Sequence, residues 1–120
     1  MPFVETVKSN RDFRRAYARG KSYQDPALIM LVIKNRAGVC RVGITTGKKI
    51  GGAVQRNRAR RVIRAAFSAF AEDVRPGCDL IFIARTRTGF LKSTELVPVM
   101  GRLLTKAGLL QKEAPTDEGI

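Results

Sequence analysis

The densest run of chemically active side chains in this sequence is a block of arginines. Residues 51–67 read GGAVQRNRARRVIRAAF and hold five arginines within nine positions, with no acidic residue among them: Arg56, Arg58, Arg60, Arg61 and Arg64. The planar guanidinium group binds phosphate oxygens through two parallel hydrogen bonds, which a lysine ammonium cannot do. Because arginines stacked at i and i+4 on one helix face destabilise that helix, we expect a polyanion to neutralise them.

The charge of the whole chain points to the same class of partner. Lysine and arginine total 23 against 10 aspartate and glutamate, which gives a net charge of +13 and a pI near 10.9. Residues 26–71 contain ten Lys or Arg and no acidic residue. Such a balance is typical of proteins that bind nucleic acid. A hydrophobic fraction of 44% in 120 residues predicts one folded domain with its own core.

The side chains of ordinary enzyme catalysis are largely absent from the sequence. The chain has no histidine, which excludes histidine-based triads, acid–base pairs and histidine zinc sites. Its ten acidic residues are scattered and none lies in the basic block, so a two-metal nuclease centre has no evident ligands. We therefore predict no catalytic residue, no metal site, no cofactor held by protein side chains and no small-molecule substrate.

One motif near the arginine block imitates a nucleotide site. The segment GITTGKK at 43–49 resembles a phosphate-binding P-loop, but the spacing between its glycines is one residue short. Lys49 also stands where a P-loop has the Ser or Thr that binds magnesium. These mismatches argue against a nucleotide triphosphatase.

The cysteines and the N-terminus indicate the compartment. Cys40 and Cys78 lie within or beside apolar runs and match no metal-binding spacing. They could form one disulfide, but small buried thiols are the favoured interpretation. The first residues lack a basic segment followed by an apolar one, and no apolar run approaches 18 residues. We expect a cytoplasmic protein with no membrane partner.

Hydrophobic patterns predict the order helix, strand, strand, helix, strand, helix, which indicates a single α+β domain over residues 1–110. Ser9 is a good N-cap for a first helix over 10–19, which Gly20 ends. Three apolar or alternating segments are predicted to be strands, at 27–33, 39–46 and 79–85.

The end of the chain carries two further expectations. The last helix follows apolar residues at helical spacing from Leu96 to Ala107. Pro98 is tolerated only in a first helical turn, so we expect this helix to start late. Residues 111–120 are polar and acidic and are predicted to form a disordered tail.

The arginine block falls on the longest predicted helix, at 53–71. Apolar residues at helical spacing form its packing stripe: Ala59, Val62, Ile63, Ala66, Phe67 and Phe70. Arg56, Arg60 and Arg64 follow one border of this stripe, and Arg58 lies near the opposite border. A merely solvated face is the alternative, but such a face normally mixes charges of both signs.

Neighbouring residues extend the basic surface. Asn57 and Arg61 lie farther round the helix, and Lys48 and Lys49 precede it in a glycine-rich loop. The first turn of a helix adds free N–H groups and a positive dipole end. We therefore predict that this surface binds the phosphates of a nucleic acid.

Several segments together resemble a known family. SNRDFRRAYARGKSY (9–23), RVGITTGKKIGGAVQRNRARRVIRAAF (41–67), PGCDLIFIAR (76–85) and LLTKAGLL (103–110) are similar, in order and spacing, to the protein subunit of bacterial ribonuclease P. The resemblance implies an α+β two-layer sandwich, with three helices on a mostly antiparallel sheet and a left-handed βαβ crossover around the arginine helix. It also implies two RNA partners: a catalytic RNA, and the precursor tRNA from which that RNA removes the 5′ leader with Mg²⁺.

The resemblance further implies two binding surfaces. The RNR motif falls on Arg56, Asn57 and Arg58. The residues implied to bind the RNA subunit are those three with Lys48, Lys49, Arg60, Arg61 and Arg64.

The second implied surface is a cleft between the first helix and the sheet, which holds the single-stranded leader. Phe13 and Tyr17 are candidates on the helix, and Arg41 and Thr45 are candidates on the polar strand face. Packing of Phe13 and Tyr17 in the core is the alternative. Leu31 stands where many family members have an aromatic residue, so we expect stacking to be lost there.

Two other classes of protein would also explain the charge. A ribosomal or general RNA-binding protein would carry a similar basic surface but needs no leader cleft. A basic amphipathic helix could lie on anionic lipid, but the core needs the apolar stripe and the chain has no tryptophan.

Overall fold

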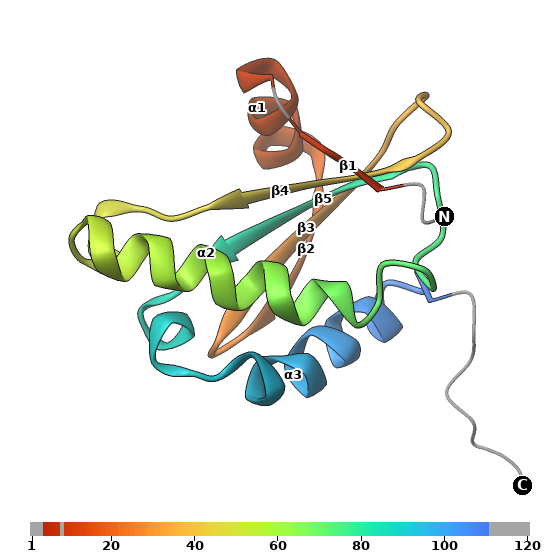
Figure 1. Ribbon diagram of the computed structural model, residues 1–120. Helices are drawn as coiled ribbons and strands as arrows, with labels where there is room; N and C mark the ends of the chain where they lie inside the picture. Colours follow the sequence, from red (N-terminus) through yellow and green to blue (C-terminus); the bar gives the residue numbers. More distant parts are fainter. Residues whose placement is uncertain (1–3, 8, 111–120) are drawn as a thin grey trace, which may run out of the picture.

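A five-stranded sheet forms the centre of the fold (Figure 1). This computed structural model describes residues 4–7 and 9–110, so the predicted tail at 111–120 lies outside the described residues. The strands are β1 (Val4–Thr6), β2 (Lys21–Asp25), β3 (Leu28–Lys34), β4 (Cys40–Thr45) and β5 (Cys78–Ala84). The helices are α1 (Asn10–Arg19), α2 (Ala53–Ser68) and α3 (Ser93–Lys106), with two short 3-10 helices, η1 (Lys48–Ile50) and η2 (Thr86–Phe90).

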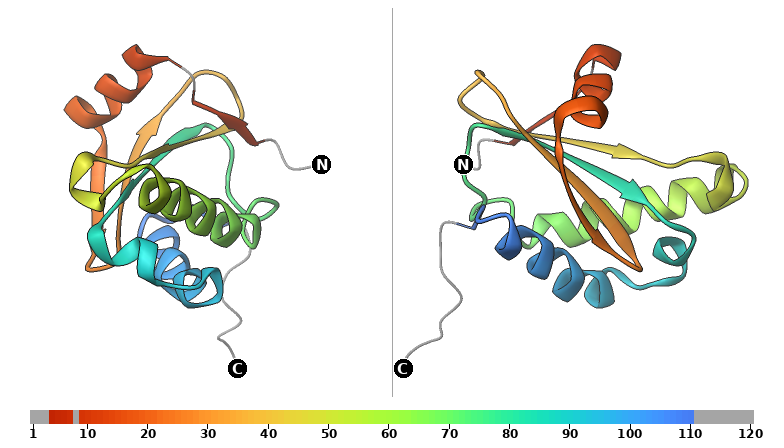
Figure 2. Two further views of the ribbon diagram at one scale, coloured as in Figure 1. Left: turned by 60° about the vertical axis from the view of Figure 1, so that its left-hand side comes forward. Right: turned by 180° about the vertical axis from the view of Figure 1, so that it is seen from behind.

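The helices cover both faces of the sheet (Figure 2). α1 packs on one face over a small buried cluster: Val7, Ala16, Leu31 and Ile81. α2 and α3 pack on the other face around a larger core that includes Ile63, Leu80, Phe82 and Met100. Both faces can be covered because successive side chains of the apolar strands β3 and β5 point to opposite sides. The α+β class is confirmed, whereas α1 adds a partial third layer to the predicted two-layer sandwich.

The strand pairing is evenly mixed. In the order β1-β4-β5-β3-β2, the pairs β1–β4 and β4–β5 are parallel, and β5–β3 and β3–β2 are antiparallel. The prediction of a mostly antiparallel sheet therefore needs correction. α2 connects the parallel neighbours β4 and β5. In Figure 1 both strands point the same way, α2 lies beneath them and β5 lies behind β4, which makes the crossover left-handed, as the resemblance implies.

The N-terminal helix forms where the capping residues predict it. The Ser9 hydroxyl accepts a hydrogen bond from the Arg11 N–H at 3.1 Å, and Asp12 lies in the positive first turn. At the other end the Gly20 N–H donates to the Ala16 carbonyl at 2.8 Å. A side chain at position 20 would collide with that carbonyl, because its Cβ would lie 2.5 Å from the oxygen. Glycine therefore allows α1 to end against the sheet.

α3 begins earlier than predicted. It starts at Ser93 and contains Pro98 in its second turn, so the expectation of a late start is wrong. Proline removes one hydrogen bond to the preceding turn. Glu95 compensates at the start of the helix, where its side chain accepts a hydrogen bond from the Lys92 N–H at 2.9 Å. Beyond Pro98 the predicted apolar face is buried: Val99, Met100, Leu103 and Leu104.

Candidate RNA-binding surfaces

α2 turns its arginines to solvent along the face opposite the core. The predicted stripe is buried at Ala59, Val62, Ile63, Ala66 and Phe67, and Phe70 lies just beyond the end of the helix. The predicted polar residues occupy the outer face: Asn57, Arg58, Arg60, Arg61 and Arg64 are exposed and Arg56 is half-buried. Within residues 4–7 and 9–110, no arginine of α2 forms an ion pair. This face is therefore a basic surface without internal neutralisation.

The N-terminal end of α2 adds to this surface. η1 carries the exposed residues Lys48 and Lys49 immediately before the helix. Gly52, at the N-cap, supplies no side-chain hydrogen bond to the first turn. The first N–H groups of a helix lack intrahelical partners and favour an anion. The two lysines and the N-terminus of α2 thus create a positive electrostatic potential at the same end of the helix.

The two borders of α2 lead into different hollows. On one border Arg58 and Arg61 line an open hollow of about 230 Å³ with Leu91, Lys92 and Ser93. The Arg58 Nε–H donates to the Gly89 carbonyl at 2.7 Å, which fixes this arginine against η2. Lys92 was not predicted to lie beside these arginines, because no local sequence pattern reveals proximity between segments about thirty residues apart.

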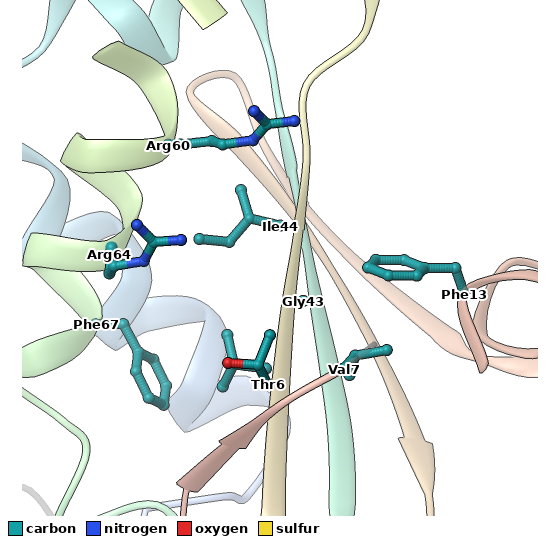
Figure 3. A pocket seen from close by; sticks show the side chains of 9 residues that line it. Thr6, Val7, Phe13, Gly43, Ile44, Arg60, Arg64 and Phe67 are labelled. Carbon is teal, nitrogen blue, oxygen red and sulfur yellow. The ribbon is translucent and has the colours of Figure 1, made fainter. Parts of the chain in front are cut away.

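On the other border Arg60 and Arg64 line a hollow of about 310 Å³ (Figure 3). Figure 3 shows these arginines on one side of β4 and Phe13 on the other, with Gly43 and Ile44 between them. β1 pairs with β4 only as far as Val42, so in the described residues no strand covers the outer edge of β4 beyond that point. The hollow therefore runs across an open sheet edge, from the α2 face to the α1 face.

Two of the residues predicted for the leader cleft, Tyr17 and Thr45, are in contact. Tyr17 is 52% exposed, and its hydroxyl group donates to the Thr45 Oγ1 at 3.1 Å. That bond holds an aromatic face open to solvent above the end of β4. Phe13 is half-buried against the α1 cluster. Its ring lies so close to the sheet that a Cβ on Gly43 would be 2.8 Å from it, so Phe13 serves the core and also lines the hollow.

Leu31 does not line the cleft as predicted. It is 7% exposed and packs beneath α1 with Val7, Ala16 and Ile81. The apolar run of β3 is buried on both faces, so the sequence pattern could not say which of its residues reach solvent.

Arg41 was predicted to be available for RNA in the leader cleft, but in the structure it is paired with two carboxylates. Its Nε and Nη2 donate to the two carboxylate oxygens of Asp79 at 2.7 Å, and its Nη1 lies 3.4 Å from Asp12. Asp79 is 2% exposed and accepts a further hydrogen bond from Asn35 at 2.7 Å. Since Arg41 is the partner of a buried carboxylate, it joins α1, β4 and β5 structurally.

Both cysteines are free thiols; Cys40 is buried, as the favoured interpretation predicted, whereas Cys78 is half-buried. Burial raises the pKa of the Cys40 thiol to about 12, and the nearby Cys78 and Asp79 add to the shift. Burial also raises the pKa of Cys78. At neutral pH both side chains are therefore protonated and behave as small apolar groups rather than as nucleophiles.

Two features are absent from the described residues. No group of three or more His, Cys, Asp or Glu side chains within them is placed to hold a metal ion. No helix in this part of the chain is long and apolar enough to cross a membrane.

The fold and these surfaces define a small basic α+β protein suited to contacts with RNA, and comparison with known proteins agrees. The profile of the Ribonuclease P family matches residues 1–108. A ribonuclease P protein component from Clostridium botulinum (strain Loch Maree / Type A3) is 36% identical over 104 residues, covering 86% of this chain and 94% of that protein. One from Clostridium kluyveri is 38% identical over 108 residues, covering 88% and 96%.

Solved structures show the same likeness. An RNase P protein structure from Staphylococcus aureus superposes with a TM-score of 0.77 at 28% identity, covering 88% of this chain and 96% of that one. One from Thermotoga maritima has a TM-score of 0.75 at 26% identity, covering 85% and 96%. The chain therefore belongs to the ribonuclease P protein family, whose members are components of an endoribonuclease that processes tRNA.

The correction at Arg41 makes a prediction about stability. Arg41→Ala leaves the Asp79 carboxylate buried without its ion-pair partner, so we expect the free energy of unfolding to fall by about 3 kcal/mol in urea titrations. The double variant Arg41→Ala/Asp79→Asn recovers part of the loss, because no unpaired buried charge remains. Wild-type stability in Arg41→Ala, together with weaker precursor tRNA binding, would return Arg41 to the RNA-binding residues.

Proposed function

We propose that this chain is the protein subunit of a ribonuclease P in which RNA performs the chemistry. The outer face of α2 binds the catalytic RNA, and the surface formed by α1 and β4 binds the 5′ leader of precursor tRNA. The observation that carries the proposal is the face of α2, where arginines lie exposed without an acidic partner in the described residues. Since precursor tRNA is made in the cytoplasm, the proposal also places the protein there.

The geometry of α2 suits a folded RNA. A rigid helix spaces its arginines at fixed intervals, and guanidinium groups bind phosphates without reading the sequence. Arg56, Asn57 and Arg58 stand at the end of the helix where Lys48 and Lys49 also lie. A partner with closely spaced phosphates on several strands can contact both groups at once.

The leader surface has the features of a single-strand site. The exposed Tyr17 ring offers a face on which an unpaired base can stack, a contact worth roughly 1–3 kcal/mol with little preference among bases. Arg60 and Arg64 reach the hollow that Phe13 also lines, so a strand leaving this surface meets phosphate-binding groups at the edge of β4. These two arginines, predicted to bind the RNA subunit, lie between the two surfaces.

Three acidic residues in the described part of the chain already have basic partners. Asp12 and Asp79 pair with Arg41, and Asp25 lies 3.4 Å from Arg102. The chain has no histidine and both thiols stay protonated at neutral pH, so neither of these side-chain types supplies a general base. In the proposal the RNA supplies the hydrolysis and its Mg²⁺, and the protein neutralises phosphate and holds the leader.

Reconstitution tests the function directly. Precursor tRNA is incubated at low, near-physiological Mg²⁺ with this protein, with a bacterial ribonuclease P RNA, or with both. We expect cleavage at the mature 5′ end only in the combined reaction, because the protein lowers the Mg²⁺ that the RNA needs. Tight RNA binding without rescue would show a general RNA-binding protein, and cleavage by the purified protein alone would contradict catalysis by RNA.

Loss of one arginine should change both the affinity for the RNA subunit and its salt dependence. Arg61→Ala removes one phosphate contact, so the slope of log K against log salt should decrease in magnitude by about one. The matched control is Arg36→Ala, which removes the same charge from an exposed turn between β3 and β4, at the opposite end of β4 from the first turn of α2. Equal effects of the two variants would mean that only net charge matters.

Binding of the leader should be separable from binding of the RNA subunit by a single substitution. Tyr17→Ala removes an exposed ring, so we expect unchanged stability, unchanged affinity for the RNA subunit and about fivefold or greater loss of affinity for precursor tRNA with a leader. Mature tRNA, which has no leader, is the control substrate and should bind both proteins alike. If Tyr17→Ala unfolds the domain instead, Tyr17 is a core residue.

A further inference from the structure

The described residues expose three large hydrophobic side chains, and only one belongs to the leader surface. Tyr17 is 52% exposed, Val54 76% and Phe90 77%. Val54 lies in the first turn of α2, and Phe90 is the last residue of η2, which packs against α2 and contacts η1. A single exposed apolar side chain is ordinary on a protein surface, so what distinguishes Phe90 is its position beside the arginine helix α2.

Phe90 is held on a rigid support. The buried Thr88 hydroxyl donates to the Ala27 carbonyl and accepts from the Arg85 N–H, which ties η2 to the core. The Leu91 N–H donates to the Thr88 carbonyl at 3.2 Å, and Arg58 donates to the Gly89 carbonyl at 2.7 Å. The residues on both sides of Phe90 are therefore fixed, and the ring is presented to solvent without a loss of loop entropy on binding.

The surroundings of Phe90 are basic. The hollow lined by Arg58, Arg61 and Lys92 extends to the residue next to Phe90 in the sequence, because Leu91 also lines it. η1, α2 and residues 85–94 contain no acidic residue, and the next acid along the chain, Glu95, has a side-chain oxygen that accepts a hydrogen bond from the Lys92 N–H at 2.9 Å. An exposed aromatic ring beside a group of cations is complementary to a nucleotide. The base can stack on the ring while the phosphate binds the cations.

We propose that Phe90 is a stacking platform for an unpaired base of the RNA subunit, whose neighbouring phosphate occupies the hollow of Arg58, Arg61 and Lys92. The base is unpaired, because a base inside a helix has no free face to offer. The ligand is the RNA subunit rather than the leader, since η2 adjoins α2 while Tyr17 lies on α1, across the sheet (Figure 1). This proposal rests on the proposed function and specifies how the same RNA is bound.

The test compares substitutions of Phe90 in binding to a bacterial ribonuclease P RNA. Phe90→Ala should reduce affinity about fivefold or more while leaving the salt slope unchanged, because no charge is removed. Phe90→Tyr keeps a planar ring and should bind like the wild type. Phe90→Leu keeps an apolar side chain without a planar face and should lose affinity as alanine does. Equal affinity of all four proteins overturns the proposal.

A fluorescent variant gives an independent readout. The chain has no tryptophan, so Phe90→Trp introduces a single indole at the platform. We expect its emission to be quenched when the RNA subunit binds, and unchanged emission at saturation overturns stacking. Light scattering tests whether Phe90 instead contacts a second copy of this chain. If the wild type is a dimer and Phe90→Ala is a monomer, the proposal is overturned. If the wild type itself does not bind the RNA, the proposed function fails, whereas wild-type binding without an effect at Phe90 rejects the platform alone.

Discussion

The molecule depends on the burial of one face of α2, because that burial offsets the mutual repulsion of the arginines on its other face. Each large apolar side chain removed from water contributes about 1.5–3 kcal/mol, and Val62, Ile63 and Phe67 are each at most 9% exposed. A like-charge pair at i,i+4 costs only about 0.2–0.5 kcal/mol. Burial is therefore several times larger than repulsion, and the helix can hold a dense positive face before any RNA arrives.

The sheet gives this helix its position and separates two surfaces. Residues of β5 alternate between the two cores, so one strand supports α1 on one side and α2 with α3 on the other. The ion pair between Arg41 and the buried Asp79 joins β4 to β5 beneath α1. It therefore helps to fix the position of the two sheet faces relative to each other. Gly43 lets the Phe13 ring approach β4, because a side chain there would collide with it. The proposed leader surface and the arginine face of α2 thus belong to one rigid domain, and they meet at the open edge of β4.

Local signals predicted the parts of this structure that local physics determines. The cap at Ser9, the end of α1 at Gly20 and the apolar stripe of α2 depend on residues close in sequence, and each is confirmed. β1 and β2 were not predicted, since they are short edge strands without an apolar run. The predicted late start of α3 was wrong, because the packing of this helix outweighs the one hydrogen bond lost at Pro98.

The candidate site shows the same limit. The arginines of α2 could be placed from helical spacing alone, and the structure puts them on the outer face. Arg41 could not be placed, because its partner Asp79 is distant in sequence and only strand pairing brings them together. Leu31 lies in a strand that is apolar on both faces, so its burial depends on where α1 packs. The rigid support of Phe90 likewise comes from Ala27, far away in the chain.

The central claim is that one small domain binds two RNAs on two separate surfaces, and site-specific photo-crosslinking tests it most directly. A photoreactive side chain is placed at position 61 or at position 17, and each protein is assembled with a ribonuclease P RNA and a precursor tRNA. The account predicts that the probe at position 61 crosslinks to the RNA subunit and the probe at position 17 crosslinks to the leader. Crosslinks from both positions to the same RNA, or the reverse assignment, would contradict it.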